Sequence, residues 1–231
     1  SRPAWWSLVG LALCGAVVLA GCEKTPQAEA ESSAETSQSD SAQQAAETGA
    51  STYFADRVVE AWEQAGAEAG WIVLNDDGQF TFRDDPPNPV FADLKAFGEV
   101  PRYLPGFTIT NWQDGMTEDL PVPKIGFGLE LYSSGITDSG IAEMARLDTL
   151  QSLNFYQGRI TDEGVKQLTE LDDLRAVSLY NTDLTDAAVK DLATIETLEF
   201  VDLGGGNVRA SSSTVYGLQQ ALPDCKVLRR R

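Results

Sequence analysis

The sequence contains no histidine, and this absence limits the chemistry that its side chains could perform. Serine and cysteine nucleophiles usually need a neighbouring imidazole as base, and histidine is a common ligand of catalytic zinc. Asp and Glu number 35 in 231 residues, so hydrolysis by a carboxylate pair stays open in principle, but no spacing selects a pair. The sequence therefore predicts no catalytic residue, no metal site, no cofactor and no enzymatic activity.

Three tyrosines that recur at intervals of 24 residues are the strongest candidates for binding. Each follows a short segment in which apolar and other residues alternate, which is typical of a strand with one buried face. The residues between the apolar ones would point to the other, concave face, where tyrosines about 4.8 Å apart would form a stripe on a rigid surface. The predicted partner-binding residues are Glu130, Tyr132, Asn154, Tyr156, Ser178, Tyr180 and Asp202.

The alternative is that these tyrosines are strand formers that pack on one another across neighbouring strands. The pattern alone leaves both interpretations open. In either case, a surface made from four short strands is expected to offer no deep pocket.

Two sets of acidic residues could suggest bound ions. A Thr-Asp pair occurs at Thr137, Thr161 and Thr185, each just before an expected helix, where side-chain oxygens accept hydrogen bonds from free N–H groups. We therefore expect helix caps, with ion binding as the alternative. The run Asp76-Asp77-Gly78 could suggest a calcium loop, but the order of ligands is wrong for one, so a hairpin turn is expected.

A 24-residue repeat must position these side chains. Ile136, Ile160, Leu184 and Val208 mark its period. Each unit contains a strand pattern, then a turn, then apolar residues at helical spacing, which predicts one strand and one short helix per unit.

These units resemble leucine-rich repeats. Leu150-x-x-Leu153-x-Phe155 fits the L-x-x-L-x-L pattern, and the block I-T-D-x-G resembles the cysteine-containing-like subclass. The resemblance implies an α/β fold, a short leucine-rich-repeat solenoid over 127–231. The family's Asn or Cys after each strand is replaced by Ser134, Gly158, Thr182 and Gly206. We therefore expect no ladder of side-chain amides bonded to backbone, and stability that depends more on packing.

Residues 53–126 are expected to cap the first repeat, which stacked repeats require. Ser51-Thr52 precedes a helical pattern that runs to Gly66, and residues 71–82 predict a β-hairpin. Residues 107–126 are interpreted as a worn opening repeat with a proline-rich loop in place of its helix.

The first 21 residues are interpreted as a signal peptide, because Arg2 precedes an apolar run that ends at Gly21-Cys22. Leu19-Ala20-Gly21-Cys22 resembles the bacterial lipoprotein signal, which implies acylation of Cys22. An ordinary secretory signal is the alternative. Residues 22–52 are poor in large apolar residues and predict a disordered tether. Cys225 would be the one other cysteine of the mature chain, expected to be buried and unreactive.

A net charge of −18 disfavours binding to nucleic acid. Together with the tyrosine stripe, this favours protein binding through the concave face as the expected function. The module is expected to be anchored by lipid to a bacterial membrane in the cell envelope, either periplasmic or surface-exposed. The partner is an unknown protein, and no small-molecule substrate is expected. The alternatives are a substrate-recognition subunit resembling ubiquitin-ligase adaptors, in which the same repeats occur, and a purely structural envelope component.

Overall fold

The computed structural model describes residues 53–87, 95–97, 100–132, 135–205 and 207–229. The chain divides into two units, Ser1–Gln43 and Gln44–Arg231, and every described residue belongs to the second. The predicted signal peptide (1–21), acylation site (Cys22), tether (22–52) and helix cap (Ser51-Thr52) lie outside the described residues, as do Ser134 and Gly206.

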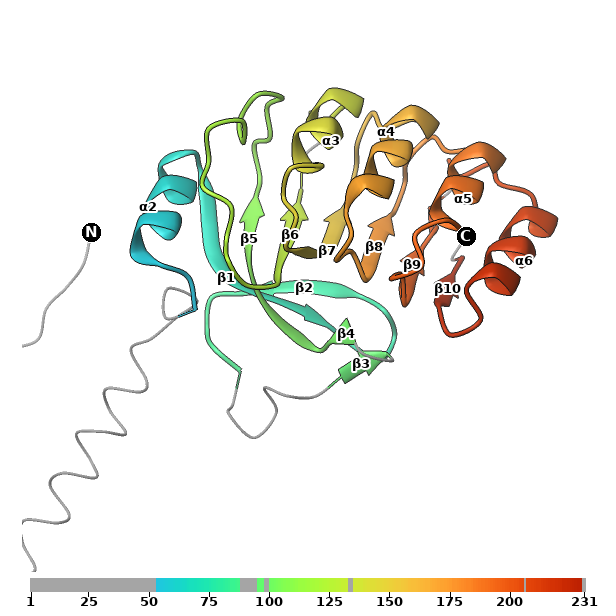
Figure 1. Ribbon diagram of the computed structural model, residues 1–231, viewed down its shortest axis with the longest axis horizontal. Helices are drawn as coiled ribbons and strands as arrows, with labels where there is room; N and C mark the ends of the chain where they lie inside the picture. The colour runs from blue at the N-terminus through green and yellow to red at the C-terminus, as the bar shows by residue number, and fades with distance from the viewer. Residues whose placement is uncertain (1–52, 88–94, 98–99, 133–134, 206, 230–231) are drawn as a thin grey trace, which may run out of the picture. The chain divides into compact units, whose positions relative to one another are not determined.

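The described residues form an α/β structure on a curved, mixed sheet of eight strands (Figure 1). Strands β5 to β10 are parallel, whereas β1 lies antiparallel to both β5 and β2. In spatial order the strands are β10 (Lys226–Leu228), β9 (Phe200–Asp202), β8 (Ala176–Leu179), β7 (Leu150–Phe155), β6 (Phe127–Leu131), β5 (Tyr103–Ile109), β1 (Ala67–Leu74) and β2 (Phe80–Arg83). A second small sheet consists of β3 (Lys95–Phe97) and β4 (Val100–Pro101).

The helices lie along the outside of the curved sheet (Figure 1). They are α2 (Asp56–Gln64), α3 (Asp138–Met144), α4 (Asp162–Gln167), the short 3-10 helix η2 (Leu168–Glu170), α5 (Asp186–Leu192) and α6 (Ser212–Ala221). From β6 onward, a strand and a helical segment alternate, as the 24-residue period predicts.

The main core lies between the sheet and these helices. In neighbouring strands Leu129 pairs with Leu153, Leu153 with Val177, and Val177 with Val201. These four side chains are fully buried. The apolar positions of the repeat thus form continuous rows on the helix side, and every other residue of the strands faces the concave side.

Threonines cap three helices, as predicted. The hydroxyls of Thr137, Thr161 and Thr185 each accept a hydrogen bond from the backbone N–H two residues later, at the start of α3, α4 and α5.

The aspartates beside these caps join neighbouring repeats. Asp138 accepts hydrogen bonds from the backbone N–H (2.8 Å) and the hydroxyl (2.7 Å) of Thr161, and Asp162 bonds in the same way to Thr185. Two further pairs extend the series, Asp114 with Thr137 and Asp186 with Ser211. Aspartate carboxylates thus form a ladder of hydrogen bonds between neighbouring repeats.

Helix α2 packs over the first strands. It begins at Asp56, and its N-cap residue, Ala55, makes no side-chain hydrogen bond. Trp62 stacks on Phe107 with ring centroids 4.5 Å apart and lies edge-on to Phe127.

Strand β5 takes the position of an additional repeat before β6. It pairs parallel with β6, and the following residues, 110–126, form turns with no helix. This arrangement matches the interpretation of 107–126 as a worn opening repeat.

Candidate functional site

The β1–β2 hairpin crosses the concave side of the sheet (Figure 1). Side chains on one face of the hairpin pack against the floor formed by the later strands, and the rings of Phe80 and Phe200 lie 5.7 Å apart. This second cluster includes Ile72, Leu74, Phe80, Ala176 and Phe200. The segment was predicted to cover the first repeat. It does pair with β5, but it also extends to β9, the strand next to the end strand β10, which the sequence did not predict.

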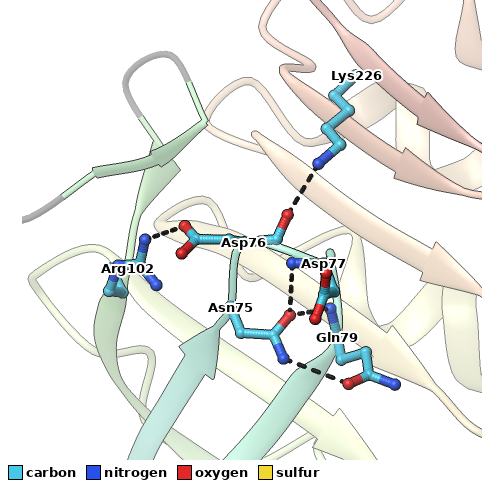
Figure 2. A network of polar contacts seen from close by, with 6 residues as sticks. All are labelled: Asn75, Asp76, Asp77, Gln79, Arg102 and Lys226. Atoms are coloured by element: carbon cyan, nitrogen blue, oxygen red, sulfur yellow. Dashed lines mark hydrogen bonds and ion pairs between the residues drawn. The ribbon is translucent and has the colours of Figure 1, made fainter.

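The tip of the hairpin is a tight turn, as predicted. The side-chain oxygen of Asn75 accepts hydrogen bonds from the backbone N–H groups of Asp77 (3.0 Å) and Gln79 (2.8 Å), as Figure 2 shows. Gly78 has a φ of 76°, a conformation that favours glycine. No group of three or more Asp, Glu or Cys residues that could hold a metal ion occurs in the described part of the chain.

Asp76 attaches this tip to strand β10 and to Arg102, the residue between β4 and β5. Its backbone carbonyl accepts a hydrogen bond from Nζ of Lys226 in β10 at 3.0 Å, and its carboxylate pairs with Arg102 (Figure 2). Lys226 and Asp76 are 150 residues apart, so the hairpin connects the beginning of the sheet to its end.

Two glycines allow the hairpin to lie close to the floor. A Cβ atom on Gly128 would lie 2.6 Å from Cγ1 of Ile72, and one on Gly106 would lie 2.3 Å from the carbonyl oxygen of Gly128. Only residues without a side chain fit below Ile72 at this distance.

The polar residues predicted on the concave face form one row. Their strands pair Glu130 with Asn154, Asn154 with Ser178, and Ser178 with Asp202. They face the concave side, as predicted, but all four are at most 4% exposed. The expectation that they are exposed was wrong, because the hairpin covers this side of the sheet.

The tyrosines one step further along the strands are more accessible. The side chain of Tyr132 is 44% exposed and that of Tyr180 is 42% exposed, whereas Tyr156, from the middle repeat, is half-buried. The rings of Tyr132 and Tyr156 stack at 4.4 Å, so the packing alternative describes this pair. The hydroxyl of Tyr156 also donates a hydrogen bond to the carbonyl of Phe80 at 3.0 Å.

A cavity of about 600 Å³ lies between β2 and the tyrosines, and we refer to it as the trough. Its volume falls within the range of roughly 300–1,000 Å³ that is usual for ligand sites. The lining residues are Gly78, Gln79, Phe80 and Thr81 from the hairpin and Asn154, Tyr156, Ser178, Tyr180 and Asp202 from the floor. The trough is a half-open hollow that was not predicted from the repeats alone. It requires the hairpin as a second wall, and nothing in the repeat pattern indicates where that hairpin lies.

Glu130 lies next to the trough and is fully buried. Its Oε1 accepts a hydrogen bond from Nδ2 of Asn154 at 2.9 Å, whereas Oε2 has no hydrogen-bond partner in the described part of the chain. Burial raises the pKa of Glu130 to about 7, against the smaller opposing effects of Asn154 and Tyr132. The hydroxyl of Thr108, opposite Glu130 in the neighbouring strand, is also buried without a partner among the described residues. The carboxyl group of Glu130 can therefore change its charge near neutral pH.

The remaining candidates lie away from the trough. Cys225 is buried, and burial raises the pKa of its thiol to about 12, which suits the predicted unreactive role. Arg229, the first residue of the terminal basic run, bonds to the carbonyl of Ala210.

No protein-family model matches this sequence, and no curated protein is significantly similar to it. Within the described ranges, no helix has the length and hydrophobicity needed to cross a membrane.

Proposed function

We propose that this protein is a lipid-anchored binding module that holds a protein partner in the trough. The observation that carries the proposal is the trough itself, which brings five of the seven predicted binding positions and a second wall from the hairpin around one cavity. Those five are Asn154, Tyr156, Ser178, Tyr180 and Asp202.

The chemistry of the lining supports binding over catalysis. Tyr156 and Tyr180 offer ring faces and hydroxyls on a rigid sheet, and aromatic side chains of this kind contribute strongly to protein interfaces. The floor provides an amide, a hydroxyl and a carboxylate, which can fix the orientation of a bound polar group. The 231 residues contain no histidine to act as a general base beside them.

We also propose that residues 127–231 form a short leucine-rich-repeat solenoid. Three features support this assignment: the 24-residue period, the parallel strands with equivalent residues in register, and the helices along one side. The mixed strands β1 and β2 are an addition at one end of this repeat array.

The proposed anchor is Cys22 in the bacterial envelope, and it is supported by Leu19-Ala20-Gly21-Cys22 alone. Intact mass of the membrane-extracted protein, compared with Cys22→Ala, tests it. A chain beginning at Cys22 with an added diacylglycerol is expected, and an unmodified chain that retains residues 1–21 would contradict the anchor.

Site-specific photo-cross-linking tests the binding function. A photoreactive phenylalanine at position 180 should cross-link to one discrete protein in cells that express the full chain. The same probe at Tyr216, which is 66% exposed on α6 away from the trough, is the matched control. Tyr156→Ala, introduced beside the probe at position 180, should reduce the specific product.

Two results would contradict the binding function. Equal products from positions 180 and 216 would show that the trough has no special role. No product from either position would favour a purely structural component.

A further inference from the structure

The outer edge of β2 faces the trough. In spatial order β2 is the last strand of the eight-stranded sheet, and β1 is its one sheet neighbour among the described residues. Two residues of β2, Phe80 and Thr81, also line the trough. The edge strand of a sheet presents main-chain N–H and C=O groups that can pair with another chain.

The direction of these groups follows from the pairing. The backbone N–H of Asn75 donates to the backbone carbonyl of Gln79, so the main-chain groups of Gln79 point toward β1. In an antiparallel pair, successive residues alternate between pointing toward the neighbour and away from it. Phe80 and Phe82 therefore direct their N–H and C=O groups away from β1, toward the open edge.

Tyr156 confirms this direction for Phe80. Its hydroxyl crosses from the floor of the trough and donates to the outward carbonyl of Phe80 at 3.0 Å. Of the described residues, Tyr156 is the one whose side chain bonds to this edge. A donor from outside can therefore reach the same row of groups on the trough side of β2.

We propose that an extended peptide segment of the partner binds in the trough as an additional strand on β2. This inference rests on the proposed function and specifies how the partner binds. The segment pairs its backbone with Phe80 and Phe82, and alternate side chains point to the floor at Asn154, Ser178 and Asp202.

The geometry favours a peptide over a glycan. Main-chain groups at strand spacing along β2 match the backbone of an extended peptide, in which donors and acceptors alternate at the same spacing. The buried carboxylate of Asp202 in the floor and the net charge of −18 favour a segment with hydrogen-bond donors or basic side chains at the inward positions.

Selection from a phage-displayed library of random linear dodecapeptides, performed on the full chain, supplies the probe. Selected peptides are then synthesised with a single N-methyl group at each position in turn. An added strand predicts that methylation at alternate positions weakens binding roughly five- to tenfold, because each lost hydrogen bond is worth about 1 kcal/mol. Methylation at the intervening positions should change affinity much less.

Two substitutions in β2 test the same contact from the protein side. Phe82→Pro removes the outward N–H, which an edge strand tolerates, whereas Phe82→Ala removes the same ring and keeps the N–H. We expect F82P to bind the selected peptide roughly fivefold more weakly than F82A. The methylation series uses the unchanged protein, so it decides the question even if F82P does not fold.

The outcomes separate this inference from the proposed function. Selected peptides without a period of two, or equal binding by F82A and F82P, would overturn the added strand. Failure to select any peptide, together with a specific protein cross-link at position 180, would also overturn it while the binding function stands. Binding of a glycan array that depends on Tyr180 would overturn both.

Discussion

Tyr156 and Phe80 join two parts of the chain that are 76 residues apart, through a 3.0 Å hydrogen bond from the tyrosine hydroxyl to the backbone carbonyl. This bond connects the stripe of tyrosines at the ends of the parallel strands to the edge of the hairpin. It also occupies a carbonyl that the proposed peptide would use. Tyr156 therefore has two separable parts, a ring that stacks on Tyr132 and a hydroxyl that competes with the ligand.

Tyr156→Phe and Tyr156→Ala should separate these parts. The Phe variant keeps the stacked ring and loses one hydrogen bond, so its free energy of unfolding should fall by about 1 kcal/mol. Its affinity for a selected peptide should equal or exceed that of the wild type, whereas the Ala variant should bind more weakly. Urea unfolding and titration calorimetry measure the two quantities. Equal losses of affinity in both variants would show that the hydroxyl contacts the ligand directly.

Glu130→Gln should change how stability depends on pH. The folded pKa of about 7 lies above the ordinary value of 4.5, so the stabilising contribution of the protonated form is complete below about pH 4.5 and is lost as pH rises through 7. Gln keeps the oxygen that accepts from Asn154 and cannot ionise. The stability of E130Q relative to wild type should therefore rise by on the order of 3 kcal/mol between pH 4.5 and pH 8.

Denaturant unfolding at both pH values measures this difference. Exposed Glu60, changed to Gln, serves as the control and should show no comparable rise. A parallel pH profile for E130Q and wild type would contradict the raised pKa of Glu130.

Asp162→Ala should weaken the ladder between repeats. The carboxylate accepts hydrogen bonds from both the N–H and the hydroxyl of Thr185, and its loss leaves two partly buried donors without a partner. We expect a loss of roughly 1–3 kcal/mol in the free energy of unfolding. Asp173→Ala, at an exposed loop position, is the matched control and should change stability little. Similar effects of the two substitutions would show that the ladder adds no stability.

Gly128→Ala should force the hairpin away from the sheet. The new methyl group would collide with Ile72, and overpacking of this kind typically costs about 1–3 kcal/mol. Combining it with Ile72→Ala should cost less than the sum of the single changes, because the second substitution removes Cγ1, the atom nearest to the new methyl group. Gly217→Ala in α6, where the methyl group meets nothing within 4 Å, should be neutral or stabilising by about 0.5–1 kcal/mol. Additive costs for Gly128 and Ile72 would contradict their contact.

The repeating part of the fold could be predicted from the sequence because it is local. Apolar residues such as Leu153 and Phe155 alternate within one strand, and Thr161 caps the helix that follows within the same 24 residues. The hairpin turn could be predicted in the same way, because the two residues that shape it, Asn75 and Gly78, lie within a few residues of each other.

The trough could not be predicted, because it depends on contacts between distant segments. Phe80 packs on Phe200, and Lys226 bonds to Asp76, but no pattern within either segment indicates the other. The burial of Glu130 and Asn154 follows from the same contacts. One signal was available: Gly128 interrupts an apolar strand, and a glycine there can indicate the close approach of another backbone or side chain.

The hairpin also has a consequence for how this protein could change in size. Arrays of stacked repeats usually gain or lose units at their ends, because each unit contacts only its neighbours. Here the tip of the hairpin bonds to β10, so its length has to match the distance across the strands between. One added repeat would move the last strand about 4.8 Å further away and leave Asp76 without Lys226. The hairpin and the parallel strands are therefore matched in length at this contact, and an added strand should break the bond at Asp76 unless the hairpin lengthens with it.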